Sequence, residues 1–311
     1  MKIVLLGKSG QVGRELARAL QPLGTVVAWS RAQADLEQPD ILRTLLRREA
    51  PDIVVNAAAY TAVDRAESEP ELARRINADT VAVIAAEVAR LGGWLVHYST
   101  DYVFDGSKAG RYVETDSTAP LNVYGRTKLE GEQLVAASGC RHLIFRTSWV
   151  YAAHGSNFVR TILRLLQERT TLSVVDDQVG APTSAARIAD VTAEILSRII
   201  LGLGGVEQGM PVSGLYHLVP SGEISWHGYA VCIAAAARAG GLSLQVTPEN
   251  ILPIRSSAYP QAARRPAHSR LDTAKLRNTF GMSLPHWQED VQHVVAALLP
   301  PVSCKPMIHS P

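Results

Sequence analysis

Three glycines near the N-terminus constrain the fold more than any other feature of this sequence. Gly7, Gly10 and Gly13 follow a short apolar stretch, residues 1–6, and precede a segment whose Leu16 and Leu20 are spaced for one face of a helix. A strand, a tight turn and a helix in this order leave the first N–H groups of the helix unpaired at the positive end of its dipole. Glycine also lets the backbone approach a ligand closely. The segment therefore predicts a site for the pyrophosphate of a dinucleotide rather than a simple turn.

Short apolar segments continue to alternate with amphipathic ones through the first half of the chain. This alternation is typical of right-handed βαβ units around a parallel sheet. It predicts an α/β protein with a Rossmann-type, doubly wound sheet and a smaller C-terminal α/β substrate domain. Strands are expected at residues 25–29, 52–55 (within the apolar run 52–59), 94–99 and 142–146, and helices at 41–48, at 71–91 and after Tyr124.

The alternation of strand and helix patterns becomes less regular after about residue 150, and the predicted domain boundary is placed there. Residues 1–150 are assigned to the dinucleotide-binding domain, with a return segment near 187–219. Residues 151–300 are assigned mainly to the substrate domain, with loops at 176–184 and 253–270. The Pro-rich end, residues 301–311, is predicted to be a flexible tail.

Composition and charge bear on which classes of binding partner are expected. The chain has 311 residues, of which 47% are hydrophobic and 19% charged, and its 31 basic and 29 acidic residues form no long run. Nucleic acid and membrane surfaces are therefore not expected as partners. Cys140, Cys232 and Cys304 are widely spaced and match no metal-binding pattern, so free thiols in the cytoplasm are expected.

The end of the second predicted strand bears on the choice of dinucleotide. An acidic residue there would accept a hydrogen bond from the ribose 2′-hydroxyl, but this chain has Ser30 and Arg31. A hydroxyl and a guanidinium can both bind a 2′-phosphate, which favours NADPH and leaves NADH open. The alternative is that Arg31 points to solvent. Asp35 and Leu36 follow slightly later and are predicted to touch the adenine.

Tyr124 and Lys128 are the predicted proton-transfer pair. Four residues apart at the start of a helix, they share one face, and a neighbouring ammonium favours the phenolate of a tyrosine. In the reducing direction Tyr124 would act as the general acid, while Lys128 would also hold the nicotinamide ribose. Thr100 ends the strand at 94–99, where it either hydrogen-bonds the substrate oxygen or caps the chain.

The small side chains Ala57, Ala58 and Ala59 follow another buried strand. They would let a nicotinamide and its ribose lie against the backbone. Asn77 on the next helix either anchors a water or a main-chain group behind the lysine, or lies on the helix surface.

Together these segments resemble the extended short-chain dehydrogenase/reductase superfamily, and within it the dTDP-4-dehydrorhamnose reductase family. The correspondence covers nearly the whole chain. Its motifs are GKSGQVG from Gly7, NAAAYTAVDRAESEPE from Asn56, HYSTDYVFDG from His97, PLNVYGRTKLEGE from Pro120, FRTSWVY from Phe145, DDQVGAPT from Asp176, GLYHLV from Gly214 and SAYPQAARRPAHSRLDT from Ser257. The resemblance implies reduction of the C4 keto group of dTDP-4-dehydro-β-L-rhamnose to dTDP-L-rhamnose.

The resemblance also implies roles for individual residues. Thr100, Tyr124 and Lys128 would be catalytic, and Asp101 and Trp149 would contact the sugar, although from the sequence alone Trp149 could equally be a core aromatic. The further residues implied beside the cofactor are Gln11, Val12, Tyr60 and Ser99. Gln178, Thr183 and Arg265 would hold the nucleotide; the alternative is that they are solvated loop residues.

Two departures limit what carries over. The absence of an acidic residue at Ser30 and Arg31 argues against a preference for NADH. Some relatives dimerise around magnesium held by glutamates; Glu15 is present, but the other aligned segments are Ala-Ala-Arg at 185–187 and Trp-Gln at 287–288. A magnesium-bridged dimer is therefore not expected, and no metal site is assigned, while a homodimer stays open.

Two alternatives to a reductase are open. A nucleotide-sugar dehydratase or epimerase would return the hydride to the same sugar, but dehydratases carry an acid after the Thr-Asp pair, where this chain has Tyr102. A non-catalytic regulatory homologue can lose the catalytic pair, whereas Tyr124 and Lys128 are both present.

Overall fold

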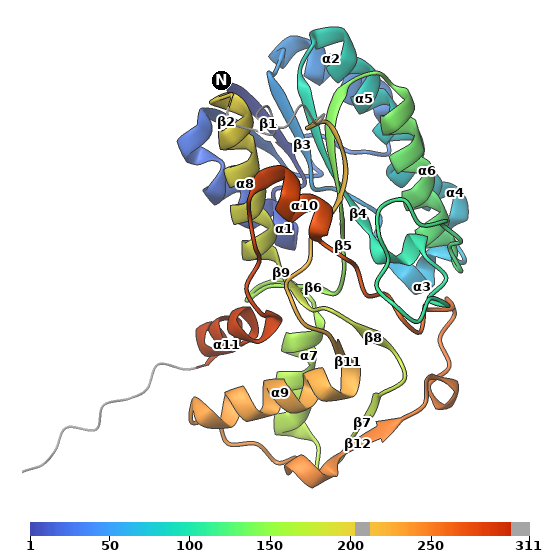
Figure 1. Ribbon diagram of the computed structural model, residues 1–311, viewed down its shortest axis with the longest axis vertical. Coiled ribbons are helices and arrows are strands. Elements are labelled where there is room, and N and C mark those ends of the chain that lie inside the picture. Colours follow the sequence, from blue (N-terminus) through green and yellow to red (C-terminus); the bar gives the residue numbers. More distant parts are fainter. Residues whose placement is uncertain (203–211, 300–311) are drawn as a thin grey trace, which may run out of the picture.

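The computed structural model describes residues 1–202 and 212–299. Six parallel strands form its main sheet, in the order β10-β5-β4-β3-β1-β2 (Figure 1). Their bounds are β1 Lys2–Leu6, β2 Thr25–Trp29, β3 Ile53–Asn56, β4 Trp94–Thr100, β5 Arg141–Thr147 and β10 Gly214–His217. β2 is added on one side of β1 and β3 on the other, so the strand order reverses at β1. Open parallel sheets bind ligands at such a topological switch point.

Helices cover both faces of this sheet, which confirms the predicted doubly wound α/β fold. One face carries α1 (Gln11–Ala19), α8 (Ala185–Ile200) and α10 (Ala274–Phe280); the other carries α2 (Pro39–Glu49), α5 (Thr80–Leu91) and α6 (Val123–Ala137). Side chains alternate along each strand, so Ile3 and Leu5 pack on the first face and Val4 and Leu6 on the second.

The predicted helix over 71–91 consists of three successive elements. α4 (Pro70–Arg74) is followed by a π-helical turn, η2 (Arg75–Asp79), and then by α5. Periodicity does not reveal such a turn, because it inserts a wider hydrogen-bonded ring within an otherwise helical run. The other short elements around this sheet are η1 (Gln21–Leu23), α3 (Val63–Ala66) and η3 (Asp101–Val103).

A second unit lies beyond the carboxyl ends of the strands, at the bottom of Figure 1. Its core lies between the helices α7 (Phe158–Glu168), α9 (Trp226–Ala239) and α11 (Trp287–Leu298), around the buried Tyr229 and Trp287. Its elements are β6 (Val150–Tyr151), α7 (Phe158–Glu168), β7 (Leu172–Val175), β8 (Val179–Gly180), β9 (Thr183–Ser184), β11 (Ile224–Ser225), α9 (Trp226–Ala239), η5 (Pro248–Asn250), β12 (Ile251–Ile254), η6 (Ser256–Ala258) and α11 (Trp287–Leu298).

The stretches 176–184 and 253–270, expected to be loops, contain β8, β9 and the end of β12. These strands have two to four residues, too few to show a two-residue period. The chain returns to the main sheet through α8 and β10, which overlap the predicted return segment 187–219. Residues 203–211 of that segment, together with the predicted tail at 301–311 and Cys304, lie outside the described residues.

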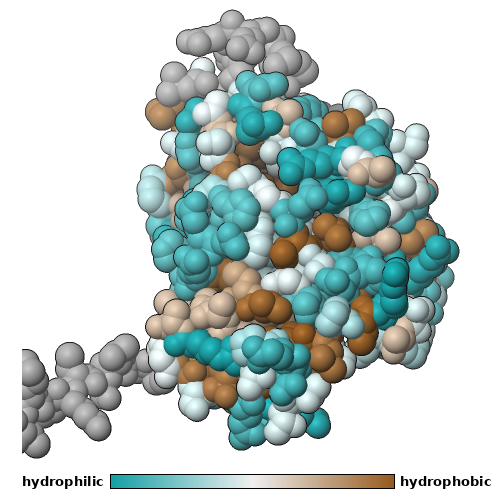
Figure 2. Space-filling model, turned by 60° about the horizontal axis from the view of Figure 1, so that its bottom comes forward, coloured by the Kyte–Doolittle hydropathy of each residue, from teal (hydrophilic) through white to brown (hydrophobic). Residues whose placement is uncertain are grey.

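Hydrophobic side chains gather in a band across the face of the molecule shown in Figure 2, between more hydrophilic regions. In the part of the chain that the structure describes, no helix is both long and apolar enough to cross a membrane. Cys140 is buried and Cys232 partly buried, and both are free thiols.

Candidate active site

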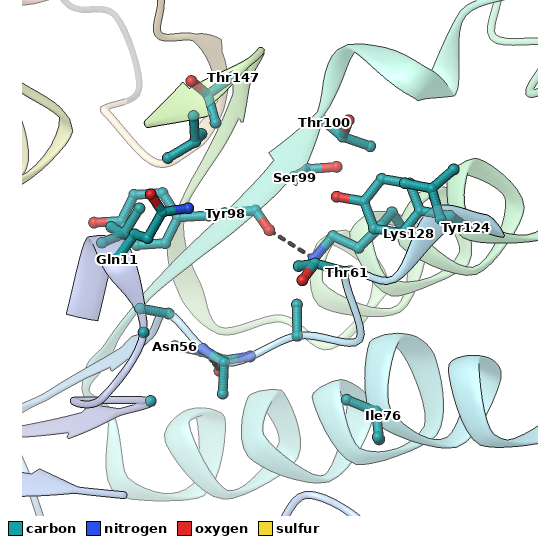
Figure 3. Close-up of a pocket in the computed structure, with 18 of the residues that line it drawn as sticks. Gln11, Asn56, Thr61, Ile76, Tyr98, Ser99, Thr100, Tyr124, Lys128 and Thr147 are labelled. Carbon is teal, nitrogen blue, oxygen red and sulfur yellow. Dashed lines mark hydrogen bonds between the residues drawn. The ribbon is translucent and has the colours of Figure 1, made fainter. Parts of the chain in front are cut away.

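A cavity of about 590 Å³ opens at the carboxyl ends of β1, β3 and β4. Many of the predicted site residues line it, and Figure 3 shows ten of its lining residues by name. The predicted residues that line it are Gly7, Gly10, Gln11, Val12, Arg31, Asp35, Leu36, Ala57, Ala58, Ala59, Ser99, Thr100, Asp101, Tyr124, Lys128 and Trp149.

The glycine loop lets β1, α1 and the chain after β3 meet closely. Gly7 has a φ of 82°, and a Cβ on it would lie 2.8 Å from the amide nitrogen of Ala58. A Cβ on Gly13 would lie 2.0 Å from the carbonyl oxygen of Gly7. Gly10 provides no side-chain cap, so the first N–H groups of α1 are left for a ligand at the cavity. This cradle, closed to any larger residue, fits the pyrophosphate of a dinucleotide.

Arg31 lies at the cavity with an exposed side chain, but it is not free of partners. Its Nε is 3.4 Å from Asp35 Oδ2, and its guanidinium also contacts the carboxylate of Glu37. Ser30 does not line the cavity. Its hydroxyl oxygen and its amide nitrogen both lie 3.1 Å from Gln33 Oε1. Arg31 is therefore shared between two carboxylates at the place where an adenosine ribose would lie.

Lys128 is almost fully buried beneath the cavity. Asn122 caps the start of α6 by accepting a 2.8 Å hydrogen bond from the Gly125 N–H, so that Tyr124 and Lys128 occupy its first two turns. The Lys128 ammonium donates to the carbonyl oxygen of Tyr98 at 2.7 Å, the bond drawn in Figure 3. Burial lowers the pKa of Lys128 to about 8, and the charge of Glu132 opposes this change.

Burial has the opposite effect on Tyr124. It raises the pKa of the phenol to about 12, a hydrogen bond with Thr100 opposes the rise, and the charge of Asp101 adds to it. The expected lowering by Lys128 is wrong for this structure, because that ammonium is directed at Tyr98 and His97 instead. Tyr124 is held as the neutral phenol, the form that a proton donor needs.

Thr100 and Asp101 end β4 beside Tyr124. The Thr100 hydroxyl donates to Asp101 Oδ1 at 3.0 Å and accepts from the Tyr102 N–H at 3.1 Å, so it is also a cap. Asp101 Oδ2 and Ser99 Oγ are buried without a hydrogen-bond partner among the described residues. Burial raises the pKa of Asp101 to about 6, although the hydrogen bond from Thr100 opposes this rise. Ser99 Oγ and Asp101 Oδ2 are therefore available to hydrogen-bond a ligand.

Trp149 forms one wall of the cavity together with a residue that the sequence did not single out. Its indole stacks on that of Trp226 with 3.5 Å between centroids and 10° between planes. Trp149 has a φ of 47°, a left-handed conformation that is strained for an aromatic residue and typical of functional sites. Trp226 is the first residue of α9, in a segment whose pattern gave no signal of a site.

Asn77 supports the lysine helix from behind. Its side chain accepts from the Tyr60 N–H at 2.9 Å and donates to the Tyr60 carbonyl and to Thr127 Oγ1, both at 3.1 Å. Of the two alternatives, the main-chain anchor is confirmed and the surface position is wrong, since Asn77 is buried.

Six predicted residues lie outside the cavity lining: Gly13, Ser30, Tyr60, Gln178, Thr183 and Arg265. The Tyr60 hydroxyl donates to Glu69 at 2.5 Å, and Arg265 is bound to Asp64 at 2.7 Å. Thr183 is fully buried, and its N–H bonds the Trp149 carbonyl. Their roles stay predictions.

The lining also includes residues that sequence reasoning missed, chiefly Asn56, Tyr98, Tyr102, Thr61 and Trp226. Asn56, Tyr98 and Tyr102 lie at or beside the ends of β3 and β4, so their position at a strand end was an available signal. Thr61 follows the alanines after β3.

Glu15, which the sequence comparison with magnesium-bridged dimers singled out, has its carboxylate 2.9 Å from His154 Nε2 and 3.8 Å from the guanidinium of Arg18. Arg187, in a second aligned segment, pairs with Asp290 at 2.8 Å. Both side chains thus have partners within the chain.

A family model described as the RmlD substrate binding domain matches residues 1–299. The chain belongs to this family. It is 49% identical over 299 residues to the dTDP-4-dehydrorhamnose reductase of Burkholderia thailandensis, covering 96% of this chain and 99% of that protein. It is 48% identical to the reductase of the same name from Escherichia coli, covering 96% and 98%. The resemblance inferred from the sequence is thereby confirmed.

Solved structures agree with this membership. The reductase of Bacillus anthracis, in complex with NADP, superposes with a TM-score of 0.83 at 32% identity, covering 94% of this chain and 98% of the other. The UDP-glucose 4-epimerase of Thermus thermophilus, in complex with NAD, gives 0.75 at 18% identity, covering 96% and 99%. The latter likeness extends to the fold alone.

Proposed function

We propose that this member of the RmlD family reduces the C4 keto group of dTDP-4-dehydro-β-L-rhamnose to dTDP-L-rhamnose with NADPH. The observation that carries the proposal is the meeting of Tyr124, Thr100 and Lys128 in the cavity that the glycine loop opens. The names of the relatives at 45–49% identity supply the substrate.

The cavity residues divide the work. The first N–H groups of α1 would bind the pyrophosphate, and Ala57, Ala58 and Ala59 would leave room for the nicotinamide and its ribose. Bound NADPH supplies the hydride that reduces the C4 carbon. Tyr124 holds its proton at neutral pH and donates it to the C4 oxygen, while Thr100 hydrogen-bonds the same oxygen. Lys128, held by the Tyr98 carbonyl, contributes a charge beneath the site and a donor for the ribose.

NADPH is proposed over NADH because the Arg31 guanidinium could bind the 2′-phosphate that only NADPH carries. It lies at the cavity and has no neighbouring acid at the strand end itself, although Asp35 and Glu37 share its charge. That sharing leaves NADH open as a second donor. NADP is also the ligand of the Bacillus anthracis structure.

The sugar is proposed to lie against Trp149, with Asp101 accepting from a hydroxyl. The second unit, within residues 151–299, would hold the dTDP part through Gln178, Thr183 and Arg265. Arg265 is bound to Asp64, so this contact requires that pair to open or to share the Arg265 guanidinium. A cytoplasmic location stays a prediction.

Stoichiometry tests the proposal. Purified protein is incubated with dTDP-4-dehydrorhamnose and NADPH, and the loss of NADPH absorbance is compared with the nucleotide-sugar product separated by chromatography. One NADPH oxidised per dTDP-rhamnose formed is expected. Product formed at constant NADPH would instead indicate an epimerase or dehydratase, and NADPH binding without any turnover would indicate a regulatory homologue.

A further inference from the structure

A buried histidine lies directly behind the catalytic lysine. Lys128 Nζ is 3.3 Å from His97 Nε2, and His97 Nδ1 is 3.3 Å from Asn56 Nδ2. His97 and Asn56 are register partners on the adjacent strands β4 and β3, and both side chains are about 1% exposed. His97 does not line the cavity, whereas Asn56 and Lys128 do. Asn56, His97 and Lys128 thus form a chain of three polar side chains leading away from and back to the site.

The amide of Asn56 has its orientation fixed by the backbone. The Ala58 N–H donates to Asn56 Oδ1 at 3.2 Å, which turns the Asn56 NH₂ group toward His97. An NH₂ group can only donate, so His97 Nδ1 must offer its lone pair. A neutral imidazole carries one proton, which is then placed on Nε2, facing Lys128.

This arrangement suits a neutral lysine and conflicts with a charged one. A neutral amine has a lone pair that accepts from the Nε2–H of His97, while it still donates to the Tyr98 carbonyl. An ammonium has only donors, so two N–H groups would face each other unless the His97 proton moves to Nδ1. That second tautomer then opposes the Asn56 NH₂ group. The chain cannot satisfy all its hydrogen bonds while Lys128 is charged.

The surrounding charges do not remove this conflict. Glu132, one turn further along α6, is paired with Arg146 of β5 by two hydrogen bonds of 2.6 and 2.9 Å. Tyr124 on α6 and Asp101 after β4 are the other titratable groups at this part of the cavity, and burial raises the pKa of both. His97 stays uncharged, since burial and the nearby Lys128 lower its pKa well below the ordinary value.

We propose that His97 and Asn56 are positioning residues that couple the charge of Lys128 to the tautomer of His97 and, through Asn56, to the backbone at Ala58. The tautomers interconvert by ordinary proton exchange with water. With Lys128 neutral, the Ala58–Asn56–His97–Lys128 chain is complete. With Lys128 charged, the bond between Asn56 and His97 is lost, and the Asn56 amide holds Ala58 less firmly. Ala58 is one of the small residues proposed to support the nicotinamide, so this consequence rests on the proposed function.

The tautomer can be measured without any turnover. Protein labelled with ¹⁵N-histidine is titrated from about pH 6.5 to about pH 9.5, and the His97 ring signals are assigned by their absence in His97→Gln. We expect the proton on Nδ1 below a pH of about 8 and on Nε2 above it, following the pKa of Lys128. A tautomer that stays the same across the range overturns the proposal.

Two variants separate the coupling from a general effect of pH. Lys128→Met removes the charge, so His97 should carry its proton on Nε2 at every pH. Asn56→Asp places an acceptor beside His97 Nδ1, so the proton should stay on Nδ1 throughout. If Lys128→Met shows the same pH-dependent switch as the wild type, His97 responds to another group and the coupling is wrong.

Kinetics supply a separate readout that a structural role would not move. In Asn56→Asp the ammonium form of Lys128 is favoured, and the alkaline limb of the kcat/KM profile should move up by roughly one pH unit or more. If the alkaline limb of the kcat/KM profile does not move in Asn56→Asp although the His97 proton stays on Nδ1, the tautomer of His97 does not affect turnover. A failure of the proposed substrate would abolish turnover but leave the NMR titration unchanged.

Discussion

Burial shifts the protonation equilibria of three titratable side chains at this cavity. Tyr124, Lys128 and Asp101 are all shifted toward their neutral forms, since the charged form of each loses hydration. A neutral phenol can donate a proton and a neutral amine can accept one. Tyr124 is therefore neutral at ordinary pH, as its proposed role as the proton donor in carbonyl reduction requires, while Lys128 and Asp101 change their charge nearer to neutral pH.

Tyr124→Phe removes the proposed proton donor while keeping the ring. We expect kcat to fall by roughly 10²–10⁴, as for the loss of a general acid, with little change in the NADPH Kd. Steady-state kinetics and a fluorescence titration with NADPH check this. Tyr112→Phe serves as the matched control, because its hydroxyl bonds Asp105 and Lys108 away from the cavity. Unchanged turnover in Tyr124→Phe would contradict the assignment.

Asp101 should make stability depend on pH. Its folded pKa of about 6 lies above the ordinary 3.8. The folded state therefore holds the proton more tightly, and wild-type stability falls as pH rises through that window. The full effect is about 3 kcal/mol at most. We expect Asp101→Asn to gain stability over wild type in urea unfolding at about pH 8 but much less at about pH 4. If the unfolding free energies of wild type and Asp101→Asn differ by the same amount at both pH values, the pKa of Asp101 is not raised in the folded state.

Arg31→Ala tests the choice of cofactor. If the guanidinium binds the 2′-phosphate, kcat/KM with NADPH should fall by about tenfold or more while the value with NADH changes little. Arg43→Ala is a suitable control, because Arg43 pairs with Asp40 and Glu87 and does not line the cavity. If the ratio of kcat/KM with NADPH to kcat/KM with NADH is unchanged in Arg31→Ala, Arg31 does not bind the 2′-phosphate and contacts only solvent, Asp35 and Glu37.

At the level of elements, the position of α6 determines how close the proposed catalytic side chains Tyr124 and Lys128 lie to Thr100. Asn122 caps it, and Gly125, between Tyr124 and Lys128, lets it approach the end of β4. A Cβ on Gly125 would lie 2.2 Å from the Tyr102 carbonyl oxygen and 3.0 Å from Pro120 Cβ. The distance between α6 and the Thr100 strand end thus depends on a residue without a side chain.

Gly125→Ala should therefore damage both stability and turnover. The helix propensity of alanine would favour the change by about 1 kcal/mol. The contact with a backbone carbonyl cannot relax by a rotamer change, so we expect a net loss of about 1–3 kcal/mol in unfolding free energy. A drop in kcat should accompany it. Gly110→Ala is the control, since a Cβ there meets only Lys108 Cε at 4.0 Å.

What the sequence could predict at this scale was the alternating part of the chain. The strands and helices of the sheet unit, the glycine loop and the Tyr124–Lys128 spacing all follow from local pattern. The π-helical turn at 75–79 and the strands of two residues in the second unit do not, because they have no period of their own. Trp226 and the Glu37 contact of Arg31 depend on how distant or irregular segments pack, which no local pattern contains.

At the scale of the whole molecule, two cores meet around one cavity. The sheet unit contributes the glycine loop and the proposed catalytic residues, while Trp226 comes from the second unit and Trp149 leads into it. Contacts between α1 and the loop before α7, such as Asn157 Nδ2 to Gln11 Oε1 at 2.8 Å, join the units beside the glycine loop. A ligand that spans the cavity would therefore be held by both cores.

Ligand-induced stabilisation can separate the two contributions. NADPH at a hundred times its Kd should raise the unfolding free energy by about 2.7 kcal/mol in wild type. The same gain is expected in Trp149→Leu, because the dinucleotide is proposed to lie on the sheet unit. Added dTDP-L-rhamnose should stabilise wild type further but have little effect on Trp149→Leu. Leu252→Ala, at an exposed position of β12, should respond to both ligands as wild type does. Loss of the NADPH effect in Trp149→Leu would place the dinucleotide against the second unit instead.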